Sequence, residues 1–152
     1  MLKHVAIVGV GGIGQRHLES CLTLPAANFA LHVVEPNAAT RGQASALVGA
    51  ASNVDWYDAV ADLPPQLDIA IVATRADIRA RVTRELIEAT TARLLILEKV
   101  LFQRASDFVE MAELFERAGA TVWVNCPRRM WPVYRDLATL VRPDRIIRIE
   151  TV

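Results

Sequence analysis

The residues in this sequence best suited to chemistry stand in one short turn near its start. Gly9, Gly11 and Gly14 form the pattern G-x-G-x-x-G directly after the mostly apolar run 4–8. Gly9 permits a tight turn, Gly11 lets the backbone approach a pyrophosphate, and Gly14 lets a following helix pack against the strand. The start of that helix offers unpaired N–H groups and a partial positive charge to phosphates. Glycines also mark plain tight turns, but the strand before them favours a dinucleotide-binding turn. Its candidate cofactor-binding residues are Gly9, Gly11, Gly12, Ile13 and Gly14.

A carboxylate closes the second apolar run. Glu35 ends the segment 29–35, and it follows Gly14 by 21 residues. An acid at this position accepts hydrogen bonds from the adenosine ribose hydroxyls, and its charge repels a 2′-phosphate, so Glu35 favours NAD. Arg41 stands about one helical turn further on and could instead meet a 2′-phosphate, which keeps NADP possible. The alternative for Glu35 is a solvated carboxylate at a strand end.

A second pair of charged residues, Glu98 and Lys99, follows another apolar run. A lysine at the mouth of a mostly apolar cleft can hydrogen-bond a substrate hydroxyl, or relay its proton while hydride passes to nicotinamide. The alternative is a surface ion pair after a strand. Position alone favours neither interpretation.

The elements that must place these residues alternate along the chain. Apolar runs that predict strands occupy 4–8, 29–35, 54–56, 67–74, 94–97 and 121–125. Segments with helical spacing separate them, except that a loop with Pro64 and Pro65 follows the third run. This alternation predicts an α/β fold with a doubly wound parallel sheet, the Rossmann fold, in strand order 3-2-1-4-5-6. Ligands bind such sheets at the carboxyl ends of the strands, where Gly9, Glu35, Thr74, Glu98 and Asn125 stand.

Composition and charge narrow the class of protein. The 152 residues carry 17 basic and 17 acidic side chains, so the net charge of zero predicts no attraction to nucleic acid or to an anionic membrane. The arginines that follow the fourth strand are broken by acids and lack interleaved aromatics, which predicts a solvated helix face. They are Arg75, Arg79, Arg81 and Arg84.

The cysteines and histidines predict neither a disulfide framework nor a metal site. Cys21 and Cys126 are far apart and indicate reduced thiols in a cytoplasmic protein. His4, His17 and His32 are not grouped at metal-ligand spacing, so we expect structural or solvated roles for them.

Taken together, these segments resemble the Gfo/Idh/MocA oxidoreductases, the family of glucose–fructose oxidoreductase and inositol dehydrogenase. The resemblance covers the whole chain and rests on 5–14 with His17, on 34–37, on 68–74, on 97–99, and on Asn125 with Arg128, Arg129 and Pro132. It implies an NAD(P)-dependent dehydrogenase that acts by hydride transfer on a hydroxyl of a small molecule, namely a sugar, a sugar derivative or a polyol.

The resemblance also implies a role for each matching residue. Lys99 would be the catalytic lysine beside nicotinamide and substrate, and Glu98 its neighbour in the cofactor site. Thr74 would line the nicotinamide side of the cleft, whereas Asn125 and Arg129 would lie near the substrate entrance.

Three residues depart from the family pattern. Val100 replaces a proline, Arg75 stands where a proline is common, and Arg79 stands where a histidine is frequent. Each departure bears more on substrate contacts than on cofactor binding.

Family members also carry a second domain that completes the substrate pocket and usually forms an oligomer interface. We therefore expect an NAD(P)-binding domain at 1–143 and the start of a substrate domain at 144–152. We expect a homo-oligomeric full-length protein, and little turnover by this chain alone. The alternatives are a non-catalytic nucleotide-binding module, such as a redox sensor or partner subunit, and a bare structural domain.

Overall fold

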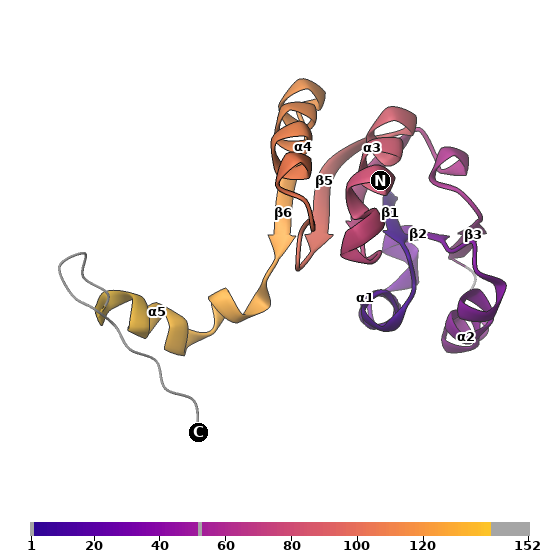
Figure 1. The fold of residues 1–152 in the computed structure, drawn as a ribbon. Coiled ribbons are helices and arrows are strands. Elements are labelled where there is room, and N and C mark those ends of the chain that lie inside the picture. Colours follow the sequence, from indigo (N-terminus) through magenta and orange to yellow (C-terminus); the bar gives the residue numbers. More distant parts are fainter. Residues whose placement is uncertain (1, 52, 141–152) are drawn as a thin grey trace.

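The computed structural model describes residues 2–51 and 53–140, which form one sheet with helices on both faces (Figure 1). The strands are β1 (Lys3–Val8), β2 (Phe29–Val34), β3 (Val54–Tyr57), β4 (Gln66–Val72), β5 (Thr91–Glu98) and β6 (Thr121–Asn125). All neighbours pair in parallel, in the order β3-β2-β1-β4-β5-β6. The predicted doubly wound fold and its strand order are therefore confirmed.

Helices connect the strands at the positions that the sequence predicts. They are α1 (Gly12–Leu22), α2 (Ala38–Val48), α3 (Ala76–Ala89), α4 (Ala105–Ala118) and α5 (Pro132–Leu140). The side chain of Asn37 caps α2 by accepting a hydrogen bond of 2.9 Å from the N–H of Thr40. Gly119 ends α4 in the left-handed conformation, with φ of 61°. Short 3-10 turns lie at Ala26–Asn28, Val60–Asp62 and Pro127–Met130.

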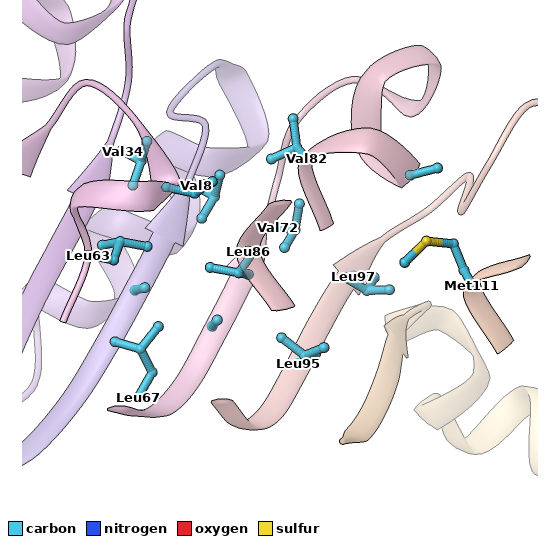
Figure 2. Close-up of a cluster of buried hydrophobic side chains, with 14 of the residues drawn as sticks. Val8, Val34, Leu63, Leu67, Val72, Val82, Leu86, Leu95, Leu97 and Met111 are labelled. Atoms are coloured by element: carbon cyan, nitrogen blue, oxygen red, sulfur yellow. The ribbon is translucent and has the colours of Figure 1, made fainter. Parts of the chain in front are cut away.

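The sheet is buried on both faces over β1, β2 and β4, which explains their nearly unbroken apolar sequences. One core joins the sheet to α1 and α2 and includes Ile7, Leu18, Leu31, Val33 and Ala44. The other core joins it to α3 and α4. Figure 2 shows this second cluster, where Leu86 of α3 and Met111 of α4 pack over strand residues such as Val72, Leu95 and Leu97. Two packed layers hold the strand ends, and hence the site, in place.

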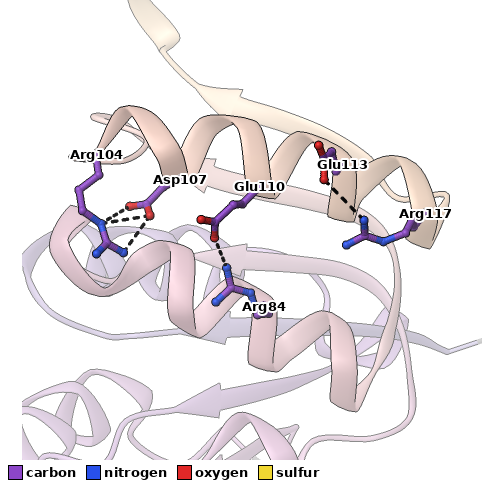
Figure 3. A network of polar contacts seen from close by, with 6 residues as sticks. All are labelled: Arg84, Arg104, Asp107, Glu110, Glu113 and Arg117. Atoms are coloured by element: carbon purple, nitrogen blue, oxygen red, sulfur yellow. Dashed lines mark hydrogen bonds and ion pairs between the residues drawn. The ribbon is translucent and has the colours of Figure 1, made fainter.

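Ion pairs lie on the surface of α3 and α4 (Figure 3). Arg84 of α3 reaches Glu110 of α4 at 2.8 Å, and Arg104 pairs with Asp107 at 2.9 Å. Arg81 pairs with Glu85 along α3 at 2.7 Å. Arg81 and Arg84 thus lie on the solvated helix face that the sequence predicts.

The last described helix, α5, extends away from the sheet together with the turn Pro127–Met130 (Figure 1). Its apolar side chains Val133, Tyr134 and Leu137 are exposed in the described chain, as is Trp131 just before it. The domain boundary expected at 143 and the start of a substrate domain expected at 144–152 lie outside the described residues.

Candidate functional site

The glycine turn between β1 and α1 has a geometry that only glycine satisfies at two positions. Gly9 has φ of 86°, and a Cβ there would come within 3.1 to 3.3 Å of three atoms of Thr74. A Cβ on Gly14 would lie 2.0 Å from the carbonyl oxygen of Gly9. Gly9 therefore makes the turn, and Gly14 lets α1 pack directly against it.

Gly11 and Gly12 meet a different requirement, because nothing lies within 4 Å of a Cβ built at either residue. Packing within the chain does not explain the absence of a side chain here. Gly11 is the N-cap of α1 and supplies no side-chain cap, so the first N–H groups of the helix face open space. This cradle fits a diphosphate. Ile13, the next residue of the turn, is exposed.

Glu35 holds the glycine turn to the end of β2. Its Oε2 accepts a hydrogen bond of 3.0 Å from the N–H of Val10, and its Oε1 accepts one of 3.0 Å from the N–H of Asn37. The side chain is buried, so it is not the solvated carboxylate of the alternative interpretation. Each carboxylate oxygen still has a second lone pair for a ligand hydroxyl.

Arg41 is already engaged with two neighbours. Its guanidinium lies 2.6 Å from the Asp58 carboxylate and 5.7 Å from the centre of the Trp56 ring. Asp58 lines the cleft beside the glycine turn, whereas Arg41 does not. A second carboxylate thus stands beside Glu35 at this end of the site.

A cleft of about 960 Å³ opens at the carboxyl ends of β1, β2 and β4. Four of the predicted cofactor-binding residues line it: Gly9, Gly11, Glu35 and Thr74. Apolar side chains such as Val60, Ile78 and Val82 cover one side. The Oγ1 atom of Thr74 is buried and has no hydrogen-bond partner among the described residues. The size of the cleft, its open glycine turn and its apolar wall fit a dinucleotide.

A second group of residues lies at the ends of β5 and β6. The buried Glu98 carboxylate accepts a hydrogen bond from Asn125 Nδ2, and its Oε1 lies 2.8 Å from Nε2 of His17 on α1. The structure thus brings together Glu98 and Asn125, two of the residues predicted at strand ends. It adds His17, for which we expect only a structural or solvated role from the sequence, although its place one turn after Gly14 in the matching motif is a usable signal.

Arg79 corrects the prediction of a solvated arginine face, because its side chain is only 3% exposed. Its guanidinium donates hydrogen bonds to the backbone carbonyls of Thr74, Glu98, Val100 and Leu101. Strand ends leave carbonyl groups without ladder partners, and here they accept from a buried cation. The acidic residues between these arginines in sequence gave no sign of this.

Lys99 and Arg129 do not line the cleft at the glycine turn. Lys99 is exposed just after β5, and its peptide bond to Val100 is cis. Arg129 lies back along β6, where it donates a hydrogen bond of 2.9 Å to the Val124 carbonyl and stacks 5.4 Å from the centre of the Trp123 ring. The site therefore has two parts, one around the glycine turn and one around Glu98, joined through Thr74 and Arg79.

Within residues 2–51 and 53–140, no helix is long and apolar enough to span a membrane, and no three His, Cys, Asp or Glu side chains gather to hold a metal ion. Cys21 and Cys126 are free thiols, and burial raises the pKa of Cys21.

The parallel sheet, the glycine turn and the carboxylate at the end of β2 define a dinucleotide-binding Rossmann domain. Residues 3–126 match the family described as the oxidoreductase family with an NAD-binding Rossmann fold, Gfo/Idh/MocA. The chain belongs to this family, and its domain is NAD-binding. The search of curated proteins gave no match.

Solved structures with the same fold share little sequence with this chain. Myo-inositol dehydrogenase from Lactobacillus casei, in complex with NAD(H) and myo-inositol, is 17% identical with a TM-score of 0.74 over 92% of this chain. UDP-N-acetylglucosamine 3-dehydrogenase from Acidithiobacillus ferrooxidans is 17% identical with a TM-score of 0.71 over 92%. A super-repressor mutant of Gal80p from Saccharomyces cerevisiae is 16% identical with a TM-score of 0.74 over 92%. The matched region spans 41%, 42% and 38% of these chains, respectively.

Proposed function

We propose that this chain is the cofactor-binding portion of an NAD-dependent oxidoreductase that oxidises or forms a hydroxyl group on a sugar, sugar derivative or polyol. The observation that carries the proposal is the cleft at the glycine turn, which Glu35 and Thr74 line and which the backbone hydrogen bonds of Arg79 connect to the strand end bearing Glu98 and Lys99. Membership of an oxidoreductase family supports it, as does the shared fold of two dehydrogenases of polyol and sugar-nucleotide substrates.

In this proposal the glycine turn binds the diphosphate through the N–H groups at the start of α1. Its residues are Gly9, Gly11, Gly12, Ile13 and Gly14. Glu35 accepts hydrogen bonds from the adenosine ribose. Thr74 and Glu98 lie at the nicotinamide side of the cofactor site. NAD, when bound, supplies the hydride chemistry. Lys99 hydrogen-bonds the substrate hydroxyl and relays its proton.

The charges favour NAD over NADP. A 2′-phosphate beside the adenosine ribose would face the carboxylates of Glu35 and Asp58, both of which line the cleft. Arg41 could bind that phosphate only by leaving Asp58, which it contacts at 2.6 Å. The repulsion and the lost ion pair both disfavour NADP.

The substrate side of the site is proposed to include Asn125 and Arg129, with a further domain completing the pocket. Residues 1–143 would then be the dinucleotide-binding domain, with the substrate domain beginning at 144–152, and these residues alone would turn over little. We further propose a cytoplasmic homo-oligomer as the whole protein. The two free thiols support the compartment, and the oligomer interface usual in the second domain of family members supports the assembly.

Lys99→Ala in the product of the complete open reading frame tests the enzymatic proposal. We expect turnover with a panel of polyols and sugars to fall about a hundredfold or more, which is the contribution of a general acid–base group. NADH affinity, measured by fluorescence titration, should stay within about twofold of the wild-type value. Lys3→Ala is the matched control, since Lys3 pairs with Asp68 at the amino end of the sheet. Unchanged turnover in Lys99→Ala would refute the role of this lysine.

The second candidate is a non-catalytic nucleotide-binding module, and one observation favours it. The Gal80p variant with the same fold carries the name of a repressor rather than of an enzyme. Under this alternative the complete protein binds NADH but oxidises no member of the panel. NADH binding without turnover would therefore decide for the module, and turnover for the enzyme.

A further inference from the structure

Arg79 makes contacts that a surface arginine does not make. One terminal nitrogen of its guanidinium, Nη1, has two N–H groups, which donate to the carbonyls of Glu98 and Val100; the carbonyl of Leu101, at 3.1 Å, shares one of them. The other terminal nitrogen, Nη2, donates to the carbonyl of Thr74. The carbonyls of Glu98 and Val100 flank Lys99 on either side along the backbone.

This arrangement needs arginine rather than another cation. The guanidinium presents five N–H donors in a rigid planar fork, whereas a lysine ammonium presents three donors on a flexible chain. Burying a charge is costly unless it is well hydrogen-bonded. Burial lowers the pKa of Arg79, and the neighbouring Glu98 carboxylate opposes this by raising that pKa. The backbone carbonyls of two loops supply further compensation through Nη1 and Nη2. The buried Nε–H has no hydrogen-bond partner among the described residues.

The turn at residues 99–101, which bears Lys99, is not held in its conformation by burial of the Lys99 and Val100 side chains. The side chain of Val100 is 68% exposed, and Lys99 is exposed as well. The turn after β5 therefore has little apolar packing of its own at these residues. The hydrogen bonds of the Arg79 guanidinium join the backbone of this turn to α3 and to the loop after β4.

We propose that Arg79 is a positioning residue that clamps the turn bearing Lys99 and fixes it relative to Thr74 in the cofactor cleft. The clamp is a property of the backbone contacts, whereas its catalytic meaning rests on the role of Lys99 under the proposed function. Because Thr74 lines the cleft, the same guanidinium sets the position of the lysine relative to the bound nucleotide.

Native-state proteolysis tests the clamp without any cofactor or substrate. Lys3 and Lys99 are the two lysines of the sequence, so a protease that cleaves after lysine reports directly on the turn. We expect the bond after Lys99 to resist cleavage in the wild-type chain despite its exposure. In Arg79→Gln, which removes the fork, cleavage after Lys99 should accelerate tenfold or more.

Leu86→Ala is the matched control for general loss of stability. Leu86 is buried in the same helix, and its truncation leaves a cavity far from the lysine turn. Cleavage rates are compared at urea concentrations that give the two variants the same unfolded fraction. Faster cleavage in Arg79→Gln alone supports the clamp, and equal rates in the two variants overturn it.

A measurement on the wild-type chain covers the case in which Arg79→Gln does not fold. Backbone ¹⁵N relaxation should give residues 99–101 order parameters of about 0.85, as for a rigid backbone. Values below about 0.6 would overturn the clamp.

In the complete protein, Arg79→Gln should lower kcat at least tenfold with NADH affinity nearly unchanged. Loss of turnover in Lys99→Ala but not in Arg79→Gln would refute the positioning role of Arg79 while leaving the proposed role of Lys99 intact. Intact turnover in Lys99→Ala would refute the role of Lys99 in the proposed function, while the cleavage rates still decide whether the clamp exists.

Discussion

Nε2 of His17 lies 2.8 Å from Oε1 of Glu98, which joins the first helix to the end of the fifth strand across 81 residues of sequence. Asn125 on β6 donates to the same oxygen. One buried carboxylate therefore ties together α1, β5 and β6. Because α1 begins at the glycine turn and β5 ends at Lys99, this contact fixes the phosphate cradle relative to the lysine.

Replacing His17 should expose how strongly Glu98 depends on it. In His17→Phe the buried carboxylate loses one of its two side-chain donors, and we expect the free energy of unfolding to fall by about 1–3 kcal/mol. His17→Gln retains a donor and should lose less. Urea denaturation of both variants measures the difference. In combination with Glu98→Gln, the effect of His17→Phe should shrink, and strict additivity of the two changes would contradict the coupling.

Two glycines of the same turn should respond to alanine in opposite ways. A Cβ at Gly14 would lie 2.0 Å from the Gly9 carbonyl oxygen, so Gly14→Ala should destabilise the fold severely. A Cβ at Gly11 meets nothing within 4 Å, so Gly11→Ala should leave the melting temperature nearly unchanged. It should nevertheless weaken NADH binding at least tenfold, because the methyl group occupies the space of the diphosphate.

Gly42→Ala is the control for these glycine variants. Gly42 lies in α2, and a Cβ there also meets nothing within 4 Å, but this residue does not line the cleft. It should leave both the melting temperature and NADH affinity at or above their wild-type values. Equal NADH affinity in Gly11→Ala and Gly42→Ala would refute the diphosphate site.

The sequence predicted the strand order and the glycine turn because both follow from local patterns. Apolar runs alternating with helical spacing have few topological solutions, and G-x-G-x-x-G carries its geometry within six residues. The ends of the strands could be assigned to one edge of the sheet on topology alone. Glu98 and Asn125 both stand at this edge, and the structure joins them by a hydrogen bond.

The contacts of Arg79 and His17 could not be predicted from the sequence, for a different reason. A charged residue among other charged residues on a helix is usually solvated. The residues next to Arg79 in the sequence do not indicate that its side chain meets backbone carbonyls at the strand ends. His17 meets a carboxylate 81 positions away, and such pairings depend on how far each strand end projects. Both contacts are set by tertiary structure.

Removal of negative charge at the ribose end of the cleft should change the preference between NADH and NADPH. In Glu35→Gln one amide oxygen replaces two carboxylate oxygens, so the N–H groups of Val10 and Asn37 can no longer both be satisfied. We expect NADH affinity to fall about tenfold or more, and the preference for NADH over NADPH to narrow. Parallel fluorescence titrations with the two nucleotides measure both effects.

Asp58→Asn provides the comparison, because it removes cleft charge without touching the glycine turn. It also releases Arg41 from its ion pair. NADPH affinity should rise while NADH affinity stays nearly constant. An unchanged ratio of the two affinities in both variants would contradict the proposed place of the ribose.

His32 should make the stability of the chain depend on pH. It is buried, its Nδ1 lies 3.0 Å from the Tyr57 hydroxyl, and its Nε2 lies 3.0 Å from Nδ1 of His4. Burial lowers the pKa of His32 below 6.5, and the charge of His4 lowers this pKa further, whereas Asp55 raises it. The unfolded chain thus binds a proton at a pH where the folded chain does not.

The free energy of unfolding should therefore fall as the pH drops from 6.5 toward the lowered pKa of folded His32, and should be insensitive to this residue above that window. His32→Gln keeps a polar partner for Tyr57 but does not titrate, so its stability should decline less over the same range. Urea denaturation at several pH values between about 5 and 8 compares the pH dependence of the free energy of unfolding in the two proteins. His4→Gln should show an intermediate slope, because it removes the neighbouring charge but leaves His32 buried. Identical slopes in wild type and His32→Gln would show that His32 is protonated as readily in the folded chain as in the unfolded one.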